Sequence, residues 1–146
     1  MCKRTYARGC RFAKWRSVIK IGENLPSDVA IDAVAVGLAK YALICQQNGL
    51  VPIVEPEVLI DGTHTIEQCM SVTQKVLGVV FTELHNHGVS FEGMLLKPNM
   101  VLKGKQNAGP ASFKQNAEFT IHALRRTVVA AVPGIFVLLI ALFLIP

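Results

Sequence analysis

Apolar and polar residues follow two different periods along this chain, and the two periods alternate. Three short runs, at residues 12–21, 50–54 and 89–97, are alternating or continuously apolar, which predicts strands. After each run, apolar residues recur every three or four positions, which predicts a helix that faces a core. These helical stripes are Ile31, Val34, Leu38, Tyr41 and Cys45; Cys69, Val72, Val76, Val80 and Leu84; and Phe113, Ala117, Ile121, Leu124 and Val128.

Turn and capping residues fix the ends of the first two predicted helices. Ser27 or Asp28 is placed to cap the first helix, and Gly49 follows its last turn. Thr65 with Gln68 has the spacing of a capping box, which predicts the start of the second helix. The segments therefore alternate strand and helix with short connections.

The same polar positions recur with a regular spacing. Lys14, Glu55 and Lys97 are separated by roughly 41 residues each, and a further step of that size reaches the apolar run at 135–145. A repeat that carries one strand and one helix predicts βα units on a parallel sheet. Closing a (β/α)8 barrel takes about 250 residues. The expected fold is therefore α/β, a partial TIM barrel with about three βα units and the start of a fourth strand.

Composition narrows the class of protein. The chain has 146 residues, of which 51% are hydrophobic and 17% charged, as in one globular domain. The net charge is +5, and residues 1–22 hold seven Lys/Arg and no acid. This could indicate a targeting peptide or a nucleic-acid surface. We expect neither, because Lys14, Arg16 and Lys20 fall on a predicted strand.

Cysteine and histidine positions do not suggest a metal site. The four cysteines are widely spaced without a Cys-x-x-Cys pair, which favours a reducing compartment over a zinc site or disulfide framework. His85 and His87 lie just before Gly88, where the second helix should end, so we expect a role at the helix terminus. No metal and no cofactor is predicted.

Lys97 is the first candidate for chemistry. Lys97 directly follows the apolar segment 94–96 and is itself followed by Pro98, which predicts a buried strand that delivers an amine to a site. Apolar neighbours remove hydration from an ammonium group, which favours the neutral amine that attacks a carbonyl. The opposing interpretation is that Lys97 simply ends a strand in water.

Four further polar residues complete the candidate set. Glu55 and Glu57 flank Pro56, which predicts that the second strand ends there, with both carboxylates on one face. Lys14 and Arg16 also share a face, and two cations on an inward face suit an anion. A carboxylate can exchange protons with a substrate near neutral pH if its pKa is raised. Glu55 and Glu57 on one face would hold each other's pKa values apart, although Lys14 would pull both pKa values down. The opposing interpretation is that Glu55 and Glu57 lie at a solvated strand end and that Lys14 and Arg16 are a pair of surface side chains.

Four segments resemble class I fructose-bisphosphate aldolases. Leu95-Leu96-Lys97-Pro98-Asn99-Met100 resembles their Schiff-base segment, and residues 49–57, GLVPIVEPE, resemble their acid/base segment. Residues 12–16, FAKWR, resemble the phosphate-side strand, and residues 123–127, ALRRT, the helix after the lysine strand. The similarity runs from about residue 10 to about residue 135.

The resemblance implies a function. Fructose 1,6-bisphosphate would be cleaved reversibly to dihydroxyacetone phosphate and glyceraldehyde 3-phosphate, in glycolysis and gluconeogenesis, in the cytoplasm. Lys97 would form the Schiff base and Glu55 would act as acid/base, with Glu57 beside it. Lys14 would help keep Lys97 neutral, and Arg16 with Lys14 would bind a substrate phosphate. Intact members would be homotetramers, whereas we do not expect this chain to form that tetramer alone.

Departures from the family divide the chain into three parts. Residues 1–11 would be a basic extension, residues 12–135 the aldolase segment, and residues 136–146 an apolar tail outside the family pattern. The family's first strands and its later Ser-Gly-Gly segment have no counterpart. The chain could therefore be an inactive fragment that associates with full-length subunits, or be anchored in a membrane by its tail. An unbroken apolar run this short would span about 16 Å as a helix, against about 30 Å of hydrocarbon, so membrane insertion is not expected. Exposed apolar ends and strand edges predict poor solubility.

Overall fold

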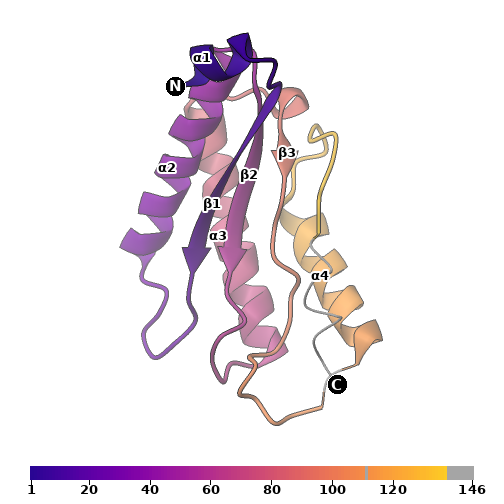
Figure 1. The fold of residues 1–146 in the computed structure, drawn as a ribbon. Coiled ribbons are helices and arrows are strands. Elements are labelled where there is room, and N and C mark those ends of the chain that lie inside the picture. Colours follow the sequence, from indigo (N-terminus) through magenta and orange to yellow (C-terminus); the bar gives the residue numbers. More distant parts are fainter. Residues whose placement is uncertain (111, 138–146) are drawn as a thin grey trace.

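The structure is a computed structural model that describes residues 1–110 and 112–137. Its centre is a parallel three-stranded sheet in the order β1-β2-β3. Figure 1 shows the helices α2, α3 and α4 on one side of this sheet. The elements are α1 (Cys2–Ala7), β1 (Phe12–Ile19), α2 (Asp28–Gln46), β2 (Val51–Val58), α3 (Ile66–Asn86), the 3-10 helix η1 (Phe91–Gly93), β3 (Leu95–Leu96) and α4 (Phe113–Thr127).

The helices begin where their capping residues predict. The Ser27 hydroxyl accepts a hydrogen bond from the backbone N–H of Ala30 at 3.3 Å. At the start of α3 the capping box is complete: the Thr65 hydroxyl accepts from the Gln68 N–H at 3.2 Å, and the Gln68 side chain accepts from the Thr65 N–H at 2.8 Å. These bonds satisfy donors that the first helical turn leaves free.

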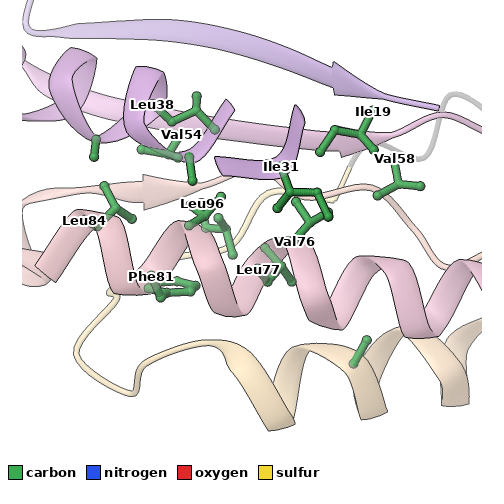
Figure 2. Packing of buried hydrophobic residues seen from close by; sticks show 14 of the residues in the cluster. Ile19, Ile31, Leu38, Val54, Val58, Val76, Leu77, Phe81, Leu84 and Leu96 are labelled. Carbon is green, nitrogen blue, oxygen red and sulfur yellow. The ribbon is translucent and has the colours of Figure 1, made fainter. Parts of the chain in front are cut away.

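A single hydrophobic core lies between the sheet and α2 and α3. Val54 of β2 and Leu96 of β3 are fully buried, and they pack towards Ile31 and Leu38 of α2 and towards Leu77 of α3. Figure 2 shows these side chains meeting from opposite layers. Successive residues of a strand point to opposite faces of the sheet, so the chain neighbours of Val54 and Leu96 point away from the helices. The α/β architecture predicted from the sequence is confirmed.

Strand β3 is much shorter than the sequence predicts. Residues 89–97 were expected to form one strand, but only Leu95–Leu96 does, and Phe91–Gly93 forms a 3-10 turn. The Gln46 side chain explains the difference, because it donates to the Ser90 carbonyl at 2.7 Å and accepts from the Ser90 N–H at 3.0 Å. These backbone groups are satisfied by a side chain instead of a neighbouring strand.

Strand β2 is longer than predicted and contains two prolines. It runs from Val51 to Val58, past the expected end at Pro56. The N–H of Val51 bonds to β1 through the Arg11 carbonyl at 2.9 Å, so the alternate residues Pro52 and Pro56 direct their nitrogens towards β3. On that side the ladder covers only Ile53 and Val54. Neither proline therefore removes a donor that the sheet uses.

A fourth segment pairs with β3. Leu96 donates to the Gly134 carbonyl at 3.1 Å and accepts from the Phe136 N–H at 2.8 Å, and Ile135 is its parallel bridge partner. The start of a fourth strand is thus present. The rest of the apolar tail, residues 138–146, lies outside the described residues, so the expectations about it are not addressed. Within the described part of the chain, none of the helices is long and apolar enough to cross a membrane.

Candidate active site

The candidate residues gather on the sheet face that the helices leave uncovered. Lys14 and Arg16 lie within β1, Glu55 and Glu57 lie within β2, and Lys97 directly follows β3. The register pairs Arg16 with Glu55, and continuing it places Lys97 beside Glu55. All five point away from the buried residues Val54 and Leu96, because their positions alternate with these. Lys97 follows the last residue of β3 and Glu57 is the last but one of β2, whereas Lys14 and Arg16 lie within β1.

Glu55 is the centre of the site. Its Oε1 accepts a hydrogen bond from the Lys97 Nζ, and its Oε2 accepts one from the Lys14 Nζ. The Glu55 side chain is only 3% exposed, compared with 17% for Lys97 and 46% for Lys14. One buried carboxylate therefore bridges two amines from the two neighbouring strands.

The pKa of Glu55 is set by burial and by two lysines, and burial acts in the opposite direction to the lysines. Burial raises the pKa of this carboxyl, but the hydrogen bonds and charges of Lys14 and Lys97 lower it more, so the pKa lies below its usual value. The downward pull expected from Lys14 is present, and Lys97 adds to it. Glu55 is therefore the ionised partner of both lysines.

Arg16 and Glu57 form a second pair further along the strands. The Arg16 Nε donates to the Glu57 Oε2 at 2.5 Å, and the side chains are 50% and 27% exposed. The hydrogen bond and charge of Glu57 raise the pKa of Arg16. The described contacts thus divide the five residues into a buried lysine–glutamate–lysine group and a more exposed arginine–glutamate pair.

Asn99 is a site-supporting residue that the sequence analysis missed. Its Oδ1 accepts from the Val58 N–H at 3.1 Å, and its Nδ2 donates to the Thr73 hydroxyl at 3.1 Å. Asn99 thereby joins the segment after Lys97 to the end of β2 and to α3. A polar residue directly after Lys97-Pro98 at the end of an apolar strand was the available signal.

Backbone hydrogen bonds join the loop after β2 to the loop after β3. Gly104 donates to the His64 carbonyl at 2.9 Å, Lys105 to the Ile60 carbonyl at 2.8 Å, and Gln106 to the Gly62 carbonyl at 3.0 Å. A Cβ on Gly104 would come within 2.1 Å of the Gly62 carbonyl oxygen, so this close approach requires glycine. The two loops form one unit at the carboxyl ends of the strands.

The histidines that the sequence analysis considered as metal ligands lie at the end of α3. His87 is the C-cap residue, and its Nδ1 is 2.8 Å from the Glu83 carbonyl. Over residues 1–110 and 112–137, no group of three potential metal ligands is found. The four cysteines are unpaired, and burial raises the pKa of Cys45 to about 11.

A parallel sheet built from βα units, with helices covering one face and charged side chains on the other, is the arrangement found in part of a (β/α)8 barrel. Comparisons with known proteins agree. The family model for fructose-bisphosphate aldolase class-I matches residues 1–140. A fructose-bisphosphate aldolase from Plasmodium falciparum, solved in complex with TRAP and a small-molecule inhibitor, superposes with a TM-score of 0.92 at 51% identity, over 93% of this chain and 40% of that one.

Curated relatives give the same result. Cytosolic fructose-bisphosphate aldolases 6 and 4 of Arabidopsis thaliana are 57% and 54% identical to this chain over 134 residues, which is 92% of its length. This chain belongs to the class I fructose-bisphosphate aldolase family, and its fold is part of that family's barrel. It spans only 37% and 34% of the length of these two relatives.

Proposed function

We propose that this chain carries the Schiff-base centre of a class I fructose-bisphosphate aldolase, which acts in the cytoplasm in glycolysis and gluconeogenesis. The observation that carries the proposal is the bridge from Glu55 to Lys97 and Lys14. The substrate would be fructose 1,6-bisphosphate, and the products dihydroxyacetone phosphate and glyceraldehyde 3-phosphate. We propose a homotetramer only for the longer members of the family, and not for these 146 residues alone.

The first half of the reaction joins Lys97 to the substrate. Transfer of a proton from Lys97 to Glu55 leaves a neutral amine, which attacks the ketose carbonyl at C2. Glu55 returns the proton as the carbinolamine loses water, which gives an iminium. Lys14 remains bonded to the other oxygen of Glu55 and holds the carboxylate in place. The contacts of Glu55 support this role because one side chain reaches both amines.

The second half breaks the carbon–carbon bond. The electron pair of the C3–C4 bond moves into the iminium to form an enamine. At the same time the C4 hydroxyl gives its proton to a carboxylate, and we propose Glu55, with Glu57 beside it, for this role. Glyceraldehyde 3-phosphate leaves. The enamine takes up a proton at C3, and water hydrolyses the new iminium to release dihydroxyacetone phosphate and free Lys97.

Arg16 is proposed to bind a phosphate of the substrate, together with Lys14. The Arg16 Nε is used by Glu57, which leaves the terminal guanidinium nitrogens to face an anion. Half of the Arg16 side chain is exposed, so a phosphate could approach without displacing the core. Glu57 would then orient the arginine.

Borohydride trapping tests the proposal directly. The purified chain would be incubated with dihydroxyacetone phosphate and borohydride, and the modified peptide identified by mass spectrometry. We expect a reduced adduct on Lys97 and no adduct in Lys97→Arg, whose guanidinium keeps a charge beside Glu55 but is not a nucleophile at neutral pH. Lys114 is a matched exposed lysine, and Lys114→Arg should leave the adduct unchanged. Folded protein without a Lys97 adduct would refute catalysis by this chain.

A second candidate function is that of a non-catalytic aldolase fragment that binds full-length subunits. The observation that favours it is that the chain spans only 34% to 37% of its Arabidopsis relatives. A tagged chain would then co-purify with full-length aldolase and change its activity, while giving no trapped adduct itself. An adduct without co-purification would favour the catalytic proposal.

A further inference from the structure

We infer that Asn99 is a positioning residue for Lys97, because its side chain fixes the backbone just beyond the lysine to the strand that carries Glu55. The inference rests on the proposed function, since it says how the nucleophile of that reaction is held. Asn99 lies two positions after Lys97 and is 9% exposed. Its hydrogen bonds go to groups outside the Lys97 side chain, so it would act on the amine through the backbone.

The segment that carries Lys97 is bonded to β2 on both sides of Glu55. The Lys97 N–H donates to the Val54 carbonyl at 2.8 Å. Two residues later, the Asn99 Oδ1 accepts from the Val58 N–H at 3.1 Å. Glu55 lies between these two bonds along β2. Both ends of the short segment with the lysine are therefore anchored to the strand that supplies its carboxylate partner.

The Asn99 side chain takes over where β3 stops pairing. The ladder between β2 and β3 ends at Val54, so it does not extend to the N–H of Val58. A buried N–H needs a partner, and the Asn99 amide provides one in place of a longer β3. Pro98 lies between the two anchors and is buried, and its ring holds φ near −65°. The backbone from Lys97 to Asn99 therefore has little freedom.

The partners of Asn99 fix the direction in which its amide faces. The Val58 N–H can only donate, so the atom that faces it is Oδ1. Nδ2 then donates to the Thr73 hydroxyl at 3.1 Å and to the Met100 carbonyl at 3.0 Å. Thr73 belongs to α3 and is 1% exposed. A reversed amide would set donor against donor and oxygen against oxygen, so the segment after Lys97 has one position relative to β2 and α3.

A lysine that forms a Schiff base needs its amine at a defined place. Lys97 has to leave Glu55 and approach a carbonyl to within about 3.5 Å, and a misplacement of about 1 Å can lower a rate about 100-fold. Strand β3 alone gives little support, because it consists of two residues. The Asn99 amide thus supplies the rigidity that a longer strand would give.

Borohydride trapping with dihydroxyacetone phosphate tests the inference in variants of Asn99 and Thr73. Asn99→Ala removes the bond to Val58, and Thr73→Val removes the hydroxyl while keeping a branched side chain. We expect the rate of adduct formation at Lys97 to fall about tenfold or more in Asn99→Ala, and by less in Thr73→Val. Thr73→Ser keeps the hydroxyl and should form the adduct at the rate of the unmodified protein.

Acetylation by acetic anhydride without substrate is the second readout. Lys97 is 17% exposed and paired with Glu55, whereas Lys114 is 86% exposed and serves as the reference within each sample. Asn99→Ala should release the segment, so acetylation of Lys97 relative to Lys114 should rise several-fold while trapping falls. The two changes are opposite because a general reagent needs only access, whereas Schiff-base formation needs a defined position.

Val76→Ala is the matched control for stability. Val76 lies one turn after Thr73 in α3, is 1% exposed and has a purely apolar side chain. Its truncation should lower the free energy of unfolding but change neither readout at Lys97, provided that circular dichroism shows every variant to be folded. An equal fall in trapping in Val76→Ala would assign the effect to stability and overturn the inference.

The inference and the proposed function fail separately. If the unmodified protein forms an adduct and Asn99→Ala forms it equally fast, the inference is wrong and the proposed function stands. If the unmodified protein forms no adduct, the proposed function is wrong, and acetylation alone decides whether Asn99 holds Lys97. Unchanged acetylation of Lys97 in Asn99→Ala would then overturn the inference as well.

Discussion

The two faces of the sheet differ in what holds their side chains in place. On the helix face, Val54 and Leu96 are fully buried among apolar residues of α2 and α3 (Figure 2). On the opposite face, Glu55 and Lys97 are held by ion pairs between strands. Each residue of one set is a direct chain neighbour of one in the other. The helix face therefore supplies the stability that allows the open face to concentrate charge.

Leu96→Ala should have the largest effect on stability and breaks the helix face. Truncating a fully buried leucine removes apolar contacts and leaves a cavity, which costs about 3 kcal/mol. Urea unfolding should show the lower midpoint. Lys97, the next residue on the other face, provides the comparison. We expect the Lys97→Met variant to be destabilised less and to lose the trapped adduct. Equal losses in the two variants would mean that the faces are not energetically distinct.

Glu55→Gln should have an intermediate effect and breaks the open face. The amide keeps the shape of the carboxyl but leaves Lys97, which is 17% exposed, without its counter-ion. We expect a loss of about 2 kcal/mol in the free energy of unfolding at pH 7. A midpoint like that of the unmodified protein would show that the bridge contributes to function alone.

Acid titration should separate two contributions to stability. The pKa of Glu55 is held below 4.5 by Lys14 and Lys97, so its stabilisation is present above that pH and is lost as the pH falls through the lowered pKa. Burial lowers the pKa of His64 below 6.5. Stability is therefore also lost here as the pH falls, but the loss begins at a higher pH than for Glu55. Unfolding free energy measured from pH 7 to pH 3 should fall in both windows. Glu55→Gln should flatten the lower window only, and His64→Gln the upper one; any other pattern would contradict these assignments.

Arg16→Gln should have the smallest effect on stability and sharpens the contrast within the open face. The pair with Glu57 is exposed to solvent, and such pairs contribute little to folding. Thermal unfolding should therefore be nearly unchanged, while sugar-phosphate binding measured by calorimetry weakens. A large drop in the melting temperature would show that this pair is structural.

The sequence predicts the helix face better than the open face. Helical periodicity and the caps at Ser27 and Thr65 locate α2 and α3, because these signals are local. The end of β2 was placed too early, because the effect of Pro56 depends on which edge its nitrogen faces. The length of β3 depends on a side chain from α2 that binds Ser90, and such a contact has no local signal.

The candidate site was only partly predictable for the same reason. The five residues were identified from spacing and from resemblance, but which amine binds which carboxylate depends on the register. The direction of the pKa shift of Glu55 follows from two simultaneous partners, which spacing alone does not specify. Asn99 supports the site through a hydrogen bond from Val58, which lies 41 residues away in the sequence.

The bonded pair of loops after β2 and β3 limits how this surface can be altered. Each loop supplies backbone partners to the other, through Gly104, Lys105 and Gln106 on one side and residues 60–64 on the other. An insertion or a grafted sequence in either loop would remove partners from both. New specificities on this scaffold would therefore be built by exchanging the two loops together as one cassette.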